Sequence, residues 1–98
     1  MIVDASRFQW DVHTDSANHE KHGITFLEAI AVFLDPQVLE DDSTRSEHGE
    51  ERRKAVGNVQ GRMLAVIFAL REDRRRIISA WRARPDERKR FDQGASDG

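Results

Sequence analysis

The chain has 98 residues, of which 38% are hydrophobic and 35% charged, and its formal net charge is −2. This length fits a single domain with a modest core, which we place at residues 1–92 with a flexible tail at 93–98. Because the sequence contains no cysteine, disulfides and cysteine-ligated metals are excluded. It shows neither a signal peptide nor a membrane-length apolar stretch, so we expect a cytoplasmic protein with no membrane partner.

The charges are divided unevenly along the chain. Residues 1–51 hold three basic and twelve acidic side chains, whereas residues 52–98 hold thirteen basic and six acidic ones. Thirteen of the sixteen basic residues are arginine, whose planar guanidinium suits two-point contact with phosphate. The asymmetry favours a polyanion-binding surface on the second half of the chain. Mutual neutralisation of the two halves within the fold fits the charge equally well.

The first 23 residues predict a strand followed by a helix. Residues 8–10 have the short alternating pattern of an edge strand. A helix is expected over residues 15–22, with Asp11 or Thr14 as its N-cap and Gly23 at its C-terminal end.

A second helix is predicted from Thr25, because Glu28 stands three residues further on in the arrangement of a capping box. Its apolar residues recur at helical spacing and end at Asp35-Pro36. From this part of the chain, the residues expected in the core are Trp10, Phe26, Ile30, Phe33 and Leu34.

The second half has the pattern of a sheet. A short strand over residues 37–42 and a polar loop over 43–51 precede three strands at 53–59, 63–71 and 74–82, with turns at 58–61 and 72–73. Residues 63–70 are apolar on both faces, as in a central strand. Pro85 begins a short helix that is expected to end near Phe91. The predicted class is α+β: two N-terminal helices and a C-terminal helix packed on a small antiparallel sheet.

Several short motifs occur together in a characteristic order. They are Phe8-Gln9-Trp10-Asp11, Asn18, Lys21-His22-Gly23-Ile24-Thr25-Phe26, Ala29, Phe33, Asp35-Pro36, His48-Gly49-Glu50-Glu51-Arg52, Gly57, Arg76-Ile77-Ile78-Ser79-Ala80, Arg82-Ala83 and Glu87-Arg88. In order and spacing they resemble the BrnT family, the ribonuclease toxins of BrnT/BrnA type II toxin–antitoxin pairs. The resemblance extends from residue 8 to about residue 91.

The resemblance implies a RelE-like fold and cleavage of RNA without a metal or other cofactor. It also implies a cognate BrnA-like antitoxin that neutralises the toxin, with operator DNA bound only through the complex of the two proteins. Two departures are Trp81, where the family usually has arginine, and Phe91, where tyrosine is common. They motivate an alternative, a catalytically weakened antitoxin-binding corepressor. A plain RNA- or DNA-binding module is a third interpretation.

Five residues are candidates for catalysis. Attack of a 2′-OH on RNA passes through a phosphorane whose added negative charge arginines can stabilise. Arg82, Arg71 and Arg52 are the candidates for that role, and antiparallel pairing is expected to bring Arg52 and Arg71 together. His48 or Glu51 would transfer the proton, although a histidine in a loop is more often a cap or exposed to solvent.

Four further residues are candidates for RNA binding: Arg76, Trp81, Arg84 and Lys21. Strict alternation along the last strand puts Ser79 and Trp81 on one face, with Arg76, Arg82 and Arg84 on the other. For Arg76 a simple ion pair is equally consistent, and for Lys21 a role at the helix end is favoured. Trp81 could stack on an RNA base. We expect no metal site, since the His19/His22 spacing lacks a third ligand.

Overall fold

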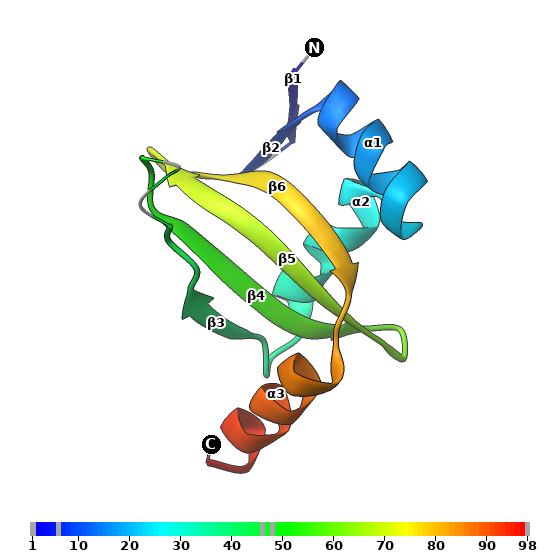
Figure 1. The fold of residues 1–98 in the computed structure, drawn as a ribbon, viewed down its shortest axis with the longest axis vertical. Helices are drawn as coiled ribbons and strands as arrows, with labels where there is room; N and C mark the ends of the chain where they lie inside the picture. The colour runs from blue at the N-terminus through cyan, green and yellow to red at the C-terminus, as the bar shows by residue number, and fades with distance from the viewer. Residues whose placement is uncertain (1, 6, 46, 48, 98) are drawn as a thin grey trace.

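The computed structural model describes residues 2–5, 7–45, 47 and 49–97, so the candidate His48 lies outside the described residues. The chain forms a six-stranded sheet in the order β1-β2-β6-β5-β4-β3 (Figure 1). Its strands are β1 (Ile2–Ala5), β2 (Phe8–Asp11), β3 (Leu39–Asp42), β4 (Arg52–Val59), β5 (Arg62–Arg71) and β6 (Arg74–Arg82). The helices are α1 (Val12–His22), α2 (Phe26–Ala29), the 3₁₀ helix η1 (Ile30–Leu34) and α3 (Pro85–Asp97).

The ends of the N-terminal helices follow the predicted capping residues. Asp11 caps α1 by accepting hydrogen bonds from two backbone N–H groups. Gly23 ends α1 in the left-handed conformation, at φ 73°, which glycine adopts without steric cost. Thr25 and Glu28 form the predicted capping box at the start of α2. Here local side-chain chemistry was sufficient to place the helix boundaries.

The second helix departs from prediction after its first turn. After Ala29 the backbone tightens into the 3₁₀ helix η1, in which residues advance by about 120° rather than 100°. Phe26 is fully buried, but Leu34 is 83% exposed, so its predicted place in the core is wrong. The tighter turn rotates Leu34 away from the face that Phe26 and Ile30 share.

The sheet is mixed and not purely antiparallel as predicted. The predicted meander of β4, β5 and β6 is antiparallel, but β2 pairs with β6 in parallel over Phe8↔Arg75 and Gln9↔Arg76. The unpredicted strand β1 pairs along the other side of β2, so the prediction that β2 lies at an edge is also wrong.

Beyond Arg76 a side chain takes the place of a neighbouring strand along β6. Asn18 of α1 donates a hydrogen bond to the Ala80 carbonyl (2.9 Å) and accepts one from the Ala80 N–H (3.0 Å). It also donates to the Ile24 carbonyl, which holds the turn after α1. The asparagine is buried, and its bonds to Ala80 fasten α1 to β6, beside which α1 lies in Figure 1.

A β-bulge in β6 changes the predicted division of its side chains between the two faces. Ile67 of β5 pairs with Ser79 and Phe68 pairs with Ile77, so Ile78 is the extra residue. Arg76 therefore lies on the same face as Ser79 and Trp81, and Arg82 lies on the opposite face. The predicted shared face of Arg76 and Arg82 is wrong, because strict alternation fails at the bulge.

The core lies between the sheet and the helices α1, α2 and η1. Its fully buried side chains include Phe26, Val32, Leu64, Phe68 and Ile77. Trp10 is buried there as predicted, with its ring edge-on to Phe26. Burial of large apolar side chains at about 1.5–3 kcal/mol each is the main stabilising contribution.

On the other face, α3 covers one end of the sheet through Phe91, which contacts Val56 and Ala65. The helix continues to Asp97, so the predicted end near Phe91 was too early.

No helix of the described chain is long and apolar enough to cross a membrane.

Candidate nucleic-acid interface

The face of the sheet opposite α1, α2 and η1 carries a concentration of positive charge, and we call it the basic face. Cross-strand pairing sets its side chains in rows. Arg52, Ala69 and Arg76 form one row, and Lys54, Ile67 and Ser79 form the next. Arg52 and Arg76 are thus two strands apart, roughly 10 Å. Alternation of side chains across β4, β5 and β6 directs all of them to this face.

A pocket of about 230 Å³ lies on the basic face. Four cationic residues line it, Arg45, Arg52, Lys54 and Arg84, and they come from the loop before β4, from β4 itself and from the segment after β6. The other lining residues are Ser43, Ile67, Ile78, Ser79, Trp81 and Glu87. A pocket with several cations and an apolar floor suits an organic anion.

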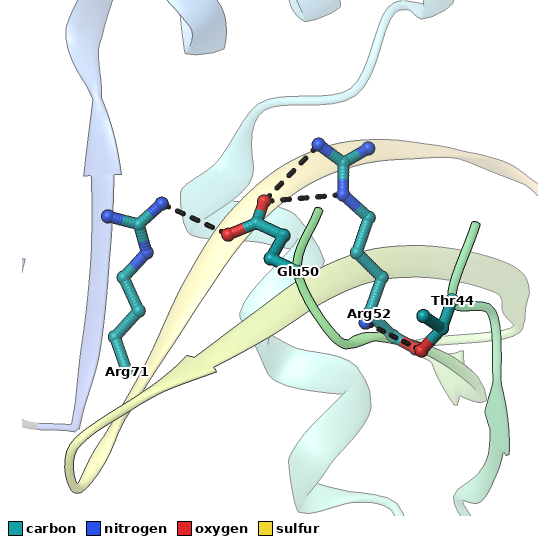
Figure 2. Close-up of polar contacts among 4 residues, drawn as sticks. All are labelled: Thr44, Glu50, Arg52 and Arg71. Atoms are coloured by element: carbon teal, nitrogen blue, oxygen red, sulfur yellow. Dashed lines mark hydrogen bonds and ion pairs between the residues drawn. The ribbon is translucent and has the colours of Figure 1, made fainter. Parts of the chain in front are cut away.

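At one end of this face, Glu50 joins two of the candidate arginines (Figure 2). Its Oε1 accepts hydrogen bonds from Arg52 Nε (3.4 Å) and Nη2 (3.3 Å). Its Oε2 accepts from Arg71 Nη2 at 3.2 Å. The predicted proximity of Arg52 and Arg71 is confirmed, and the residue that links them is Glu50. Glu51, which the sequence suggested as a base or as the residue that orients His48, has an exposed side chain.

The loop that carries Glu50 is attached to the start of β4. Thr44 Oγ1 accepts from the Arg52 N–H at 3.0 Å and donates to the Arg52 carbonyl (Figure 2). The Ser43 N–H also donates to that carbonyl, at 2.8 Å. The loop thereby holds Glu50 beside Arg52, and the side chain of Arg52 is only 21% exposed. A signal for Glu50 was available in the sequence, since residues two apart in an extended chain point to the same side.

At the other end of the pocket, Glu87 is a buried carboxylate with three donors. Its Oε1 accepts from the Trp81 indole N–H (2.9 Å) and the Arg84 backbone N–H (2.8 Å). Its Oε2 forms an ion pair with Lys54 at 2.9 Å. Burial tends to raise the pKa of the Glu87 carboxyl, but these three hydrogen bonds and the charge of Lys54 outweigh it, and the net pKa is lowered. Glu87 is therefore an anion that holds Lys54 in place.

The model of the BrnT family, described as the ribonuclease toxin of a type II toxin–antitoxin system, matches residues 10–87. The chain belongs to the BrnT toxin family. The comparison with curated proteins found no match. Membership of a type II family implies a protein antitoxin as partner.

The matched range contains the whole basic face of this BrnT toxin. It includes Glu50, Arg52, Arg71 and Lys54 and ends at Glu87. The resemblance inferred from the sequence motifs is thus confirmed at the level of the family. The roles of the individual residues remain predictions.

Trp81, which departs from the BrnT pattern, is held by its neighbours. Besides its bond to Glu87, its ring lies under the Arg84 guanidinium, 4.8 Å from the ring centroid. The His22 ring is 6.2 Å away, centroid to centroid. The prediction that Arg84 shares a face with Arg82 is wrong, because β6 ends at Arg82 and the chain turns toward α3. Arg84 instead lies beside Trp81 at the pocket.

Arg82 lies apart from the other candidate arginines. It pairs with Leu64, seven residues along β5 from Arg71, which corresponds to about 23 Å. It lines a second pocket with Arg62 and Arg88 near the β4–β5 turn. Arg82 and Arg71 therefore cannot bind one phosphate together.

The other two predicted RNA-binding residues, Arg76 and Lys21, lie on different elements, β6 and α1. Arg76 donates a hydrogen bond to the Gln9 side chain at 2.9 Å, which leaves it on the basic face while tying β6 to β2. Lys21 is exposed in the last turn of α1, where the helix-end interpretation placed it. Within the described ranges, no three His, Asp or Glu side chains cluster as a metal site requires.

Proposed function

We propose that this BrnT-family protein is an endoribonuclease that cleaves RNA without a metal ion, on its basic face. In the proposed reaction a base removes the proton from a 2′-OH, and O2′ bonds to phosphorus as the bond to O5′ breaks. The products are a 2′,3′-cyclic phosphate and a 5′-OH that takes up a proton. The observation that supports this proposal is the Arg52–Glu50–Arg71 cluster beside a cationic pocket (Figure 2).

Arg52 is the first candidate to bind the scissile phosphate. It is partly buried, its guanidinium is oriented by Glu50, and its backbone is held by Thr44. A guanidinium held in place in this way stabilises a phosphorane without the cost of being ordered during the reaction. Arg71 is on the far side of Glu50 and is 52% exposed, so we assign it to the flanking phosphate.

Proton transfer is assigned to the loop between β3 and β4. The candidates from the sequence are His48, two residues before Glu50, and Glu51, directly after it. An imidazole near neutral pKa suits both removal and return of a proton. Arg82, about 23 Å from Arg71, is assigned to RNA beyond the cleavage point.

A cognate BrnA-like antitoxin is the proposed partner, with operator DNA reached only through the toxin–antitoxin complex in the cytoplasm. The alternative function is a weakened corepressor that binds the antitoxin without cleaving RNA. Trp81 favours it, because an arginine of the family pattern is replaced by a side chain that Glu87 and Arg84 hold in place.

The test is cleavage of a long RNA by the purified protein in EDTA, with ribosomes added in a parallel reaction. Arg52→Ala is expected to lower the rate about 10²–10³-fold, as for loss of one donor to a developing anion. Arg53→Ala is the matched control, because Arg53 is adjacent in sequence but pairs with Glu40 on the helix-covered face. Absence of cleavage by folded protein in both reactions would support the corepressor, and equal losses in the two variants would exclude a role specific to the basic face.

A further inference from the structure

The pocket on the basic face contains apolar side chains that a purely phosphate-binding surface does not require. Ile67 and Ile78 lie in its lining among Arg45, Arg52 and Lys54. Both isoleucines are partly exposed. Because they stay in contact with water, Ile67 and Ile78 gain less free energy from burial than the buried apolar residues on the helix-covered face. A ligand with an apolar surface would cover them.

The β-bulge places two successive residues of β6, Ile78 and Ser79, at the pocket. Ile77 pairs with Phe68 and is 1% exposed in the core, and Ser79 pairs with Ile67. The extra residue between them, Ile78, is turned toward the basic face. Bulges commonly redirect a side chain next to a functional site. Without the bulge, Ile78 would still lie on this face opposite Ile67, but Ser79 and Trp81 would be turned to the helix-covered face.

One wall of the pocket is a flat cationic surface. The Arg84 guanidinium lies 4.8 Å from the centroid of the Trp81 ring, and Glu87 holds both residues through the indole N–H and the Arg84 backbone N–H. Guanidinium planes supported in this way stack on unpaired bases in RNA complexes. The stack thus provides a ring-binding wall beside the isoleucine floor.

We propose that this pocket binds one unstacked base of single-stranded RNA, next to the phosphate bound by Arg52. The base lies on Ile67 and Ile78 against Arg84, while Arg45 and Lys54 face the adjoining backbone. This assignment rests on the proposed ribonuclease function and adds the substrate class: an unpaired nucleotide, with duplex RNA excluded because its bases stay stacked. The base contacts described are apolar and stacking contacts, which every base offers, so we expect weak discrimination among the four bases.

The test uses a short single-stranded RNA with a mapped cleavage site, in which one nucleotide at a time is replaced by an abasic residue. At a single position near the scissile bond, the abasic RNA should lose about tenfold in kcat/KM, the scale of one stacked base. Ile78→Ala should lower the rate on intact RNA by a similar factor and should be nearly insensitive to the abasic residue at that position. Uniform cleavage of all abasic RNAs by the wild type would overturn the proposal.

Controls distinguish a loss of base binding in the pocket from unfolding of the protein and from an absence of RNA cleavage. Leu34→Ala removes an exposed leucine on the other side of the molecule and should retain the wild-type response to abasic RNA. Ile67→Ala is a second pocket variant if Ile78→Ala unfolds, as judged by thermal denaturation. If no RNA is cleaved, the ribonuclease proposal fails by itself, and fluorescence anisotropy with the corresponding 2′-deoxy oligomers then tests the pocket. Equal affinity for intact and abasic oligomers would reject it.

Discussion

The same three strands supply core residues to one face of the sheet and charged residues to the other. On the helix-covered face, β4, β5 and β6 contribute residues such as Ala55, Phe68 and Ile77, which are buried in one apolar core. On the basic face the intervening residues include Arg52, Lys54 and Arg76. The period of two in an extended chain therefore separates stability from candidate function within single strands.

Arginine itself behaves differently on the two faces. Arg75, on the helix-covered face, lies over the Phe33 ring at 4.8 Å, and its Nε has no hydrogen-bond partner among the described residues. Its neighbour Arg76 lies on the basic face and bonds to Gln9. Residue type alone thus does not identify a phosphate-binding arginine, and the face on which it lies is also needed.

The largest expected contrast is between two adjacent isoleucines. Ile77→Ala should lower the free energy of unfolding by about 2–5 kcal/mol, because it leaves a cavity in the core. Ile78→Ala should cost clearly less, since Ile78 faces a solvent-accessible pocket. Chemical denaturation of both variants measures the difference. Equal losses would mean that the basic face contributes to the core as much as the other face does.

An intermediate contrast is expected between the adjacent arginines. Arg76→Ala should lower RNA cleavage about tenfold, as expected for loss of one charge-assisted contact to phosphate. Arg75→Ala should leave cleavage nearly unchanged while lowering the melting temperature, because Arg75 packs on Phe33 and Phe68. Rates normalised to the folded fraction provide the comparison. A larger cleavage defect in Arg75→Ala would contradict the division between faces.

The smallest effect concerns acid stability on the helix-covered face. The hydrogen bond from Arg62 (2.9 Å), together with those from Thr25, lowers the pKa of Glu28 from 4.5 to about 2. This lowered pKa stabilises the fold above about pH 4.5, and the contribution is lost as the pH falls toward 2. Because the Glu28 side chain is 38% exposed, we expect its contribution to the free energy of unfolding to be below about 1 kcal/mol. Glu28→Gln should flatten the pH dependence of the free energy of unfolding in this range, as measured by denaturation at several pH values. An unchanged slope would mean that other carboxylates cause this pH dependence.

Local signals in the sequence were sufficient for most of the elements. The Asp11 cap, the Gly23 stop and the Thr25–Glu28 capping box were readable because each depends on residues within one helical turn. The meander of β4, β5 and β6 was readable from apolar runs separated by turns. The parallel pairing of β2 with β6 was not, because it joins residues 67 positions apart.

For the candidate site, the sequence indicated the residue types and the proposed chemistry, and the tertiary structure decided which of those residues lie together. The BrnT motifs and the arginine-rich second half pointed to RNA, and the family match agrees with them. Only the folded chain showed that Glu50 joins Arg52 to Arg71 and that Arg82 is far from both. The loop before β4 brings Glu50 to both arginines, whereas Arg82 lies seven residues from Arg71 along β5 and is turned to the opposite face by the bulged residue Ile78. Residue type persists through such a shift, whereas the direction of a side chain does not.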